Sequence, residues 1–244
     1  MVEKDKRAVP RIVAGIWGVP KSGKTHLALT FPDPIAAIEI GETGIEDLLW
    51  KFEREGKEIE HIPIFVPNLS MSASDHNRIL TEFEKKLKEV VANPKYKTVV
   101  IDSMSRLWRS IRVVKTEEAH QISERQKKNQ ADFELANDYH EQIVMMARTR
   151  KDLNVVLVHR HRDVYAQVLN PETGRSQLTA TGDVESRDYK GLENIVQLMI
   201  RTDARGGKFY QTLELCRFDA RLNGRVYEGF GYPQLMEQLF GEEE

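Results

Sequence analysis

Apolar runs alternate with amphipathic tracts along most of the chain. One tract carries apolar residues at helical spacing between Asp75, a predicted N-cap, and Pro94, which closes the helix. Apolar runs separated by such tracts indicate a parallel sheet that helices cover on both faces. Five runs have the length and composition of strands: residues 12–17, 35–40, 62–67, 97–103 and 154–159.

The other segments follow different patterns. A long polar helical tract covers residues 105–150, with a predicted break at 127–130. Residues 164–182 favour a hairpin that turns around 170–174, and residues 208–218 alternate like a strand that pairs near Val226. We therefore predict an α/β fold whose mostly parallel sheet is flanked by helices and followed by C-terminal antiparallel strands.

Length and composition fit one globular domain. The chain has 244 residues, and we expect a single domain over 1–244 with a short N-terminal tail (1–10) and an acidic C-terminal tail (241–244). Its one cysteine, Cys216, excludes an intramolecular disulfide and a cysteine-based zinc site. No apolar run approaches 18 residues, so we expect a cytoplasmic protein. With a net charge of −2, nucleic acid could bind only at a local basic patch.

A phosphate-binding motif follows the first predicted strand. Gly18, Gly23, Lys24 and Thr25 have the spacing G-x-x-x-x-G-K-[ST], and a short predicted helix over residues 25–30 comes next. In such a loop backbone N–H groups surround a polyphosphate, the lysine reaches its β- and γ-oxygens, and the hydroxyl ligates Mg²⁺. We therefore expect ATP and Mg²⁺ as cofactors. The predicted nucleotide-binding residues are Gly18, Val19, Pro20, Lys21, Ser22, Gly23, Lys24, Thr25 and His26.

Asp102 is the candidate for the second metal-binding residue. It ends the apolar strand Val99–Ile101, which would place its carboxylate at the carboxyl edge of the sheet beside the P-loop. There it could hold Mg²⁺ through a water or through Thr25. The competing interpretation is an aspartate that only caps the next helix.

A carboxylate is also needed to orient the attacking water. Glu42 stands just past the predicted strand 35–40, whereas Glu39 lies inside it. A glutamate at the carboxyl end of a strand can face the γ-phosphate and act as general base. We favour Glu42. The competing interpretations are a solvated turn residue for Glu42 and a structural ion pair for Glu39.

The order of these motifs resembles that of the RecA-like ATPase core. "GVPKSGKT", "IEIGETGIED", "TVVIDS" and "NVVLVH" follow one another as in the small RecA-core ATPases of bacteriophages, which are related to the RecA and RadA recombinases and include single-strand-annealing proteins. The resemblance covers roughly residues 10–220. It implies a RecA-like P-loop NTPase core in which Glu42 activates water.

The same resemblance implies further roles. His159, at the end of the strand 154–159, would sense the γ-phosphate, and single-stranded DNA would bind to the loops after that strand and after Asp102. Self-association into a ring or short filament would let a basic residue of one subunit complete the site of its neighbour. Candidates for that residue are Lys190, Arg217 and Arg221.

Basic clusters occur at both expected DNA loops. Arg106, Arg109, Arg112 and Lys115 recur every three residues, so they lie on one side of a helix. At the end of the predicted strand 154–159, the sequence "HRHRD" includes Arg160 and Arg162, and Tyr165 beyond it could stack on a base. The competing interpretation is that these are solvated basic faces.

Three classes of function fit the sequence. The first is a DNA-dependent ATPase acting on single-stranded DNA in phage-type recombination, annealing or repair, and we favour it. The second is a replication or packaging motor with the same core, although the chain shows no second domain for a helicase collar or nuclease. The third is a nucleotide or small-molecule kinase, for which residues 160–190 could serve as a lid. The pair of Glu42 and Asp102 fits water activation better than phosphate transfer to an acceptor.

Overall fold

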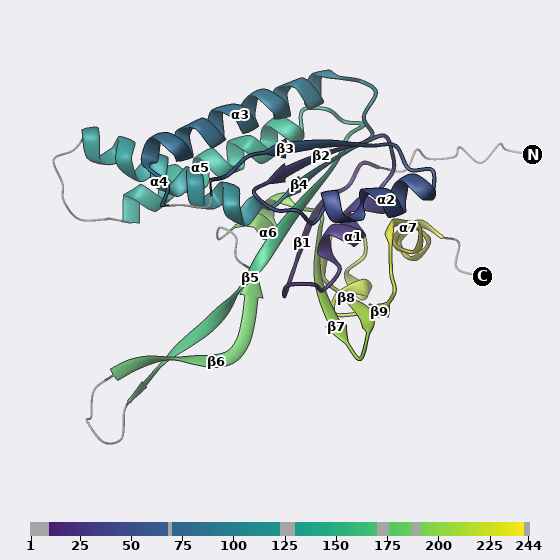
Figure 1. Cartoon of the computed structure of the whole chain (residues 1–244). Coiled ribbons are helices and arrows are strands. Elements are labelled where there is room, and N and C mark those ends of the chain that lie inside the picture. The colour runs from purple at the N-terminus through teal and green to yellow at the C-terminus, as the bar shows by residue number, and fades with distance from the viewer. Residues whose placement is uncertain (1–9, 68–69, 123–129, 170–175, 187–190, 242–244) are drawn as a thin grey trace, which may run out of the picture.

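A central sheet organises the computed structural model, which describes residues 10–67, 70–122, 130–169, 176–186 and 191–241. The strands follow one another across the sheet in the order β3-β2-β4-β5-β1-β7-β8-β9, and β6 pairs with β5 (Figure 1). They are β1 (Val13–Gly18), β2 (Ile35–Ile40), β3 (Ile59–Ile64), β4 (Thr98–Asp102), β5 (Asn154–Leu169), β6 (Ser176–Ser186), β7 (Leu198–Arg205), β8 (Lys208–Cys216) and β9 (Val226–Glu228).

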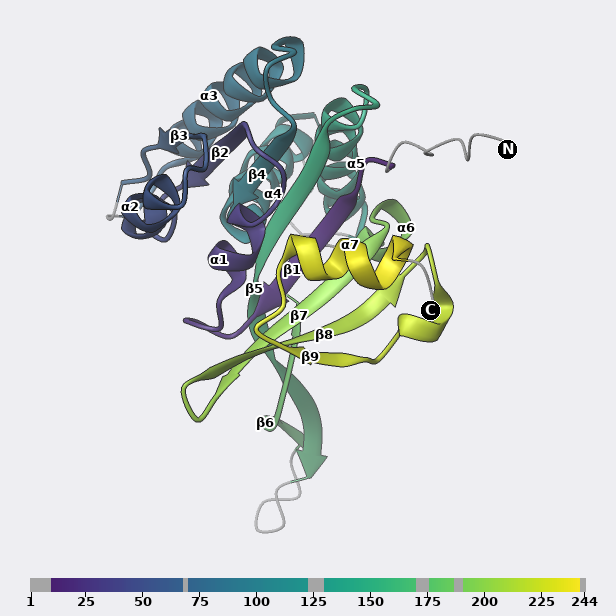
Figure 2. The ribbon, with the colours of Figure 1, turned by 90° about the vertical axis from the view of Figure 1, so that its right-hand side faces the viewer.

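Helices cover both faces of this sheet (Figures 1 and 2). Apolar side chains of α3, α4 and α5 pack on one face, and those of α1, α2 and α7 pack on the other. The helices are α1 (Lys24–Leu29), α2 (Glu46–Arg54), α3 (Ala73–Ala92), α4 (Met104–Ile122), α5 (Gln130–Ala147), α6 (Leu192–Ile195) and α7 (Tyr232–Phe240), with a 3₁₀ helix at Ala220–Leu222.

The sheet is parallel from β3 to β7 and antiparallel from β7 to β9. Apolar runs such as Val99–Ile101 are buried on both faces, which is what a parallel sheet between two helical layers requires. The predicted α/β P-loop NTPase fold, with C-terminal antiparallel strands, is therefore confirmed. Because β1, β2, β4 and β5 run in the same direction, their carboxyl ends meet at one edge.

Two element boundaries differ from the sequence prediction. The third strand is Ile59–Ile64 rather than 62–67, and as an edge strand it accommodates Pro63, which has no N–H to donate. The N-cap of α3 is Ser72 rather than Asp75. Ser72 Oγ accepts from the Asp75 N–H at 3.2 Å, and an Asp75 carboxylate oxygen accepts from the Ser72 N–H at 2.9 Å, which forms a capping box.

The fifth strand continues well beyond the sheet. After its parallel part beside β1 and β4, β5 pairs with β6 in an antiparallel register that reaches Leu169 and Ser176. The two strands form an arm that projects from the body (Figure 1). The predicted hairpin is confirmed by this pairing, whereas its turn and the predicted helix break at 127–130 lie largely outside the described residues. In the part of the chain described here, no helix combines the length and apolar character needed to cross a membrane.

Phe83 tests the packing of the helical layer on the sheet. Its ring is fully buried between α3 and the sheet, so Phe83→Ala should lower the free energy of unfolding by about 3–5 kcal/mol. Lys85→Ala, an exposed change in the same helix, should stay within about 0.5 kcal/mol. Chemical denaturation of both variants measures the difference, and equal stabilities would contradict the packing described.

Candidate nucleotide-binding site

The P-loop connects β1 to α1 at the carboxyl edge of the sheet. At Gly18 an added Cβ would lie 2.2 Å from the carbonyl oxygen of Thr202 in β7, so no side chain fits. Gly23 has φ +88°, a conformation that L-residues rarely adopt. Ser22 Oγ lies 2.6 Å from Thr202 Oγ1, which fixes the loop against β7. These contacts hold a tight backbone turn whose N–H groups can surround a phosphate.

Lys24 is folded onto this loop. Its Nζ donates to the carbonyl oxygens of Gly18 at 3.0 Å and Val19 at 2.7 Å. Burial lowers the pKa of Lys24, whereas the negative charges of Asp102 and Glu42 act in the opposite direction. The ammonium group is therefore held inside the turn, where the oxygens of a polyphosphate would offer better partners than two carbonyls.

Thr25 and Asp102 connect the P-loop to β4. Thr25 Oγ1 donates to Asp102 Oδ2 at 2.6 Å, and the carboxylate is almost fully buried. Burial raises the pKa of Asp102 to about 6; the hydrogen bond from Thr25 opposes this rise, and the charges of Glu42 and Glu39 add to it.

This donor set fits Mg²⁺. The ion is commonly bound by one or two protein oxygens together with waters and phosphate oxygens, and not by a cage of protein ligands. Among the described residues there is no cluster of three or more His, Cys, Asp or Glu side chains that could hold a metal ion. Thr25 and Asp102 would hold the ion beside the phosphates.

Glu39 and Glu42 lie in different surroundings. Glu39 is buried in β2, where its carboxylate accepts from the Ile45 N–H at 2.7 Å and lies 2.7 Å from His61 Nε2. Burial raises the pKa of Glu39, and the Ile45 N–H opposes that rise. Both carboxylate oxygens of Glu39 thus hold neighbouring elements, which supports a structural role. Glu42, by contrast, lines the cavity in front of the P-loop.

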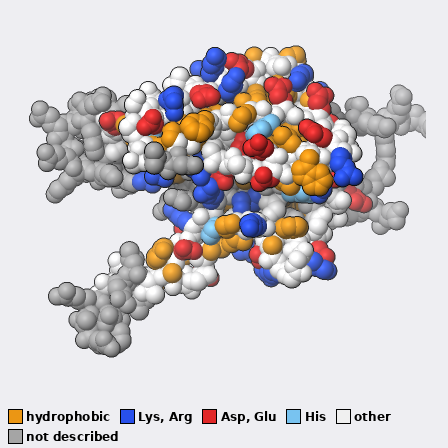
Figure 3. Space-filling model, in the orientation of Figure 1, with side chains coloured by type: hydrophobic (Ala, Val, Ile, Leu, Met, Phe, Trp, Pro, Cys, Tyr) orange, Lys and Arg blue, Asp and Glu red, His pale blue; other side chains and the backbone are white. Residues whose placement is uncertain are grey.

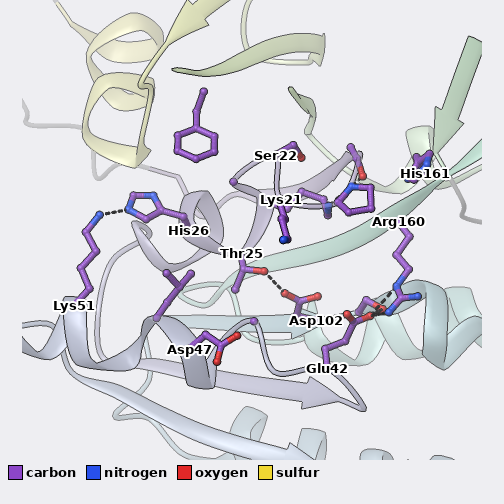
Figure 4. A pocket seen from close by; sticks show the side chains of 18 residues that line it. Lys21, Ser22, Thr25, His26, Glu42, Asp47, Lys51, Asp102, Arg160 and His161 are labelled. Atoms are coloured by element: carbon purple, nitrogen blue, oxygen red, sulfur yellow. Dashed lines mark hydrogen bonds and ion pairs between the residues drawn. The ribbon is translucent and has the colours of Figure 1, made fainter. Parts of the chain in front are cut away.

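Glu42 is held by two arginines in this structure. Its Oε1 accepts from Arg160 Nε at 2.8 Å (Figure 4). The same oxygen lies 3.4 Å from Arg106 Nε. Ser103, next to Asp102, donates its hydroxyl to the same oxygen at 3.0 Å. A carboxylate engaged in this way must exchange at least one partner before it can take a proton from water.

The structure does not bring His159 to the site. Successive residues of a strand point to opposite faces, and His159 shares its face with Val155 and Leu157, toward the layer of α3, α4 and α5. Its ring is fully buried there, and burial lowers its pKa to about 3. The neighbouring Arg160 and His161 line the nucleotide cavity instead.

The cavity holds several residues that the sequence did not single out. It has a volume of about 770 Å³, and Figure 4 shows that side chains from the P-loop, α2, β4 and β5 surround it. The ring of Phe209 lies over Gly23, 3.2 Å from where a Cβ of that residue would be. Besides Phe209, the unpredicted lining residues include Asp47, Lys51, Ser103 and His161. Ser103 and His161 are direct neighbours of the predicted Asp102 and Arg160, whereas Asp47, Lys51 and Phe209 lie outside every motif and could not be found by a local motif search.

The other predicted residues lie away from the P-loop cavity. Arg162 pairs with Glu185 at 2.7 Å on the arm, where Tyr165 is exposed. Arg217 donates to the carbonyl oxygen of Glu193, and Arg221 pairs with Asp219. Arg106 and Arg109 line a second cavity behind Glu42. Lys190 lies outside the described residues.

Comparison with known proteins agrees with this geometry. Residues 11–221 match the family described as an AAA domain. No curated protein matches the chain. Among solved structures, one similar chain belongs to a study of a prototypical ATPase from the type III secretion system of pathogenic bacteria, with 13% sequence identity and a TM-score of 0.48. The alignment covers 80% of this chain and 52% of that one, so the present chain spans about half of its length. Since the family match extends over most of the sequence, the chain belongs to this AAA-domain family of P-loop ATPases.

Proposed function

We propose that this P-loop ATPase hydrolyses ATP in a manner that depends on single-stranded DNA, in recombination, annealing or repair, as in the bacteriophage RecA-core ATPases that it resembles. The observation that carries the proposal is the contact between Glu42 and Arg160. It joins the candidate general base to the first residue of β5 beyond the buried part of the strand, where a basic face begins. A ligand on that face can therefore influence the chemistry.

The chain supplies each group that phosphoryl transfer to water requires. The P-loop N–H groups and Lys24 bind the phosphates, and Thr25 and Asp102 hold Mg²⁺, which would neutralise charge on the transferring phosphoryl group. Glu42 orients water and takes its proton once Arg160 and Arg106 have released the carboxylate. Arg160 also lines the cavity, and its charge would then be available to the phosphates.

Charge distribution supports a DNA contact at the base of the arm and along α4. Residues 161–186 contain two arginines but four acidic residues, so most of the arm does not favour phosphate. The segment from Arg106 to Lys128 contains seven basic residues and three acidic ones. In Figure 3, Lys and Arg side chains gather below the helical layer, close to where the arm leaves the body. We therefore assign the backbone contacts to Arg106, Arg109 and Arg160, with Arg162 and Tyr165 at the border of this face.

Self-association into a ring or short filament belongs to the same proposal. Arg217 and Arg221 follow β8, which runs antiparallel to β7, so they lie at the edge of the sheet opposite the P-loop. From there they could reach a nucleotide only in a neighbouring subunit.

Loss of Lys24 or Asp102 should abolish hydrolysis. Lys24→Ala removes the ammonium group whose positive charge would stabilise the transferring phosphoryl group, and Asp102→Ala removes a Mg²⁺ partner. Each change should therefore slow turnover by at least ~10²-fold. Phosphate release by the purified variants measures the effect, with circular dichroism to verify folding. Normal turnover in either folded variant would contradict the assigned site.

Replacement of the two glutamates should separate the general base from the structural carboxylate. Glu42→Gln should still bind ATP and Mg²⁺ but hydrolyse ATP ~10²–10⁴-fold more slowly, because the amide cannot accept a proton. Glu39→Gln should chiefly lower the melting temperature, since it weakens the contact with His61. An active Glu42→Gln beside a folded but inactive Glu39→Gln would assign the base to Glu39.

Single-stranded DNA should accelerate ATP hydrolysis, and nucleotide should strengthen DNA binding. Coupling between two sites typically changes affinity by ~5–150-fold. Fluorescence anisotropy of a labelled oligonucleotide, with and without a non-hydrolysable ATP analogue, measures the coupling, and the ATPase rate is measured with the same oligonucleotide. If neither rate nor affinity responds, the DNA-dependent function is wrong, although the ATPase site itself would stand.

A further inference from the structure

A second, smaller cavity lies behind Glu42, between α4 and β5. It has a volume of about 140 Å³, and its polar lining consists of Arg106, Arg109 and Arg160 with Ser105 and Ser110. Since a water molecule occupies about 30 Å³ of liquid, the space corresponds to four or five waters. Arg160 is the one described residue that lines both this cavity and the nucleotide cavity.

The charges around this cavity are unbalanced. Glu42 contacts Arg160 and Arg106 through a single oxygen. Arg106 Nε is inaccessible to solvent and has no hydrogen-bond partner beyond the 3.4 Å ion pair with Glu42. Among the described residues, no carboxylate lies within ion-pair distance of Arg109. Two guanidinium groups therefore share the Glu42 carboxylate, and the third, that of Arg109, has no carboxylate of the described residues beside it.

Arg109 also lies near a buried histidine beside the cavity. The buried His76 ring lies beside α4, with Nδ1 3.0 Å from Ser110 Oγ. Burial lowers the pKa of His76, and the charge of Arg109 lowers it further. The site thus already disfavours an additional cation, whereas an anion would neutralise the surplus.

We propose that this cavity binds one tetrahedral phosphate group. Guanidinium groups recognise phosphate through pairs of parallel hydrogen bonds, and convergent arginines make the contact specific for an oxyanion. With a volume of about 140 Å³, the cavity has room for a phosphate group. The bound group is a phosphodiester of single-stranded DNA or the inorganic phosphate that the adjacent site releases. The first source rests on the proposed DNA-dependent function, and the second requires only ATP hydrolysis.

Such an anion would compete with Glu42 for Arg160 and Arg106. Both arginines already contact the carboxylate, and both line the second cavity. When they turn to a phosphate group, Glu42 loses the cations that hold it. Occupation of the second cavity would thereby affect the general base without any ligand contact to Glu42.

Inorganic phosphate provides the first test. The protein is saturated with Mg²⁺ and a non-hydrolysable ATP analogue, so that the P-loop cannot take the probe, and phosphate is titrated calorimetrically at constant ionic strength. We expect one site that Arg109→Gln weakens about 10- to 100-fold, because a charged hydrogen-bond partner is lost. Arg54→Gln, an exposed change in α2 outside both cavities, is the matched control and should bind phosphate like the wild type.

A single-stranded oligonucleotide provides the second test. With the same variants, the slope of log affinity against log salt should decrease by about 0.7 in Arg109→Gln, the value for one phosphate contact on a single strand, and stay unchanged in Arg54→Gln. If Arg109→Gln weakens phosphate binding but leaves the salt slope unchanged, the ligand is the released inorganic phosphate. If Arg109→Gln lowers the salt slope but leaves phosphate binding unchanged, the ligand is a phosphodiester of the DNA.

Failure of the proposed phosphate site can be distinguished from failure of the proposed DNA-dependent function. If folded Arg109→Gln matches the wild type in both tests, the cavity binds no phosphate and the proposal is overturned. If the wild type does not bind the oligonucleotide, the DNA-dependent function fails, and the phosphate titration alone decides the cavity.

Discussion

The hydrogen bond between Thr25 and Asp102 is the contact on which the site depends. An ionised carboxylate at the end of a buried strand is costly unless charged or polar groups satisfy it. Here Thr25 donates from the first turn of α1, and the charge of Lys24 partly offsets the burial. The contact ties the P-loop, which follows β1, to β4 across the one intervening strand, β5. The same two side chains would hold Mg²⁺, so the fold already brings the residues of the metal site together.

Arg160 has the corresponding role between the site and the rest of the molecule. Ser105 of α4 accepts from its backbone N–H at 2.9 Å, while its guanidinium reaches Glu42. Beyond it, β5 leaves the sheet and becomes the arm. A displacement of the arm or of α4 would therefore alter a contact to Glu42, the proposed general base, and this contact would connect the projecting hairpin to hydrolysis.

The parts of the fold that depend on local sequence were predictable. The strands Val13–Gly18, Ile35–Ile40 and Thr98–Asp102 were visible as apolar runs because they are buried on both faces. The glycine spacing of the P-loop and the position of Asp102 at the end of its strand followed from the same runs. In these cases the functional residues directly follow the apolar runs that predict the strands.

The remaining features depend on contacts between distant segments. A strand pattern buried on both faces does not show which residue faces the nucleotide, so the sensor role that the resemblance implied for His159 could not be checked against the sequence, and Arg160 was expected only at the DNA. Phe209 reaches Gly23 only because β7 and β8 turn back over the P-loop. The second cavity joins residues of α4 to one of β5 about 50 positions later. Its three arginines were each noted as basic residues, but nothing in the sequence placed them around one space.

The contact between Glu42 and Arg160 also determines the sign of the proposed coupling. A phosphate group in the second cavity and the γ-phosphate of ATP both attract arginine away from the same carboxylate. The cost of breaking the ion pair is incurred once, by whichever ligand binds first, so the second ligand binds more tightly. This holds as long as the two ligands do not both require the guanidinium of Arg160. Arg106 and Arg109 make that condition reasonable, because they line only the second cavity and can retain its phosphate while Arg160 turns to the nucleotide. Arg106 and Arg109 thus serve only the phosphate in the second cavity, whereas Arg160 is shared with the nucleotide. This division favours positive coupling between the two ligands over competition.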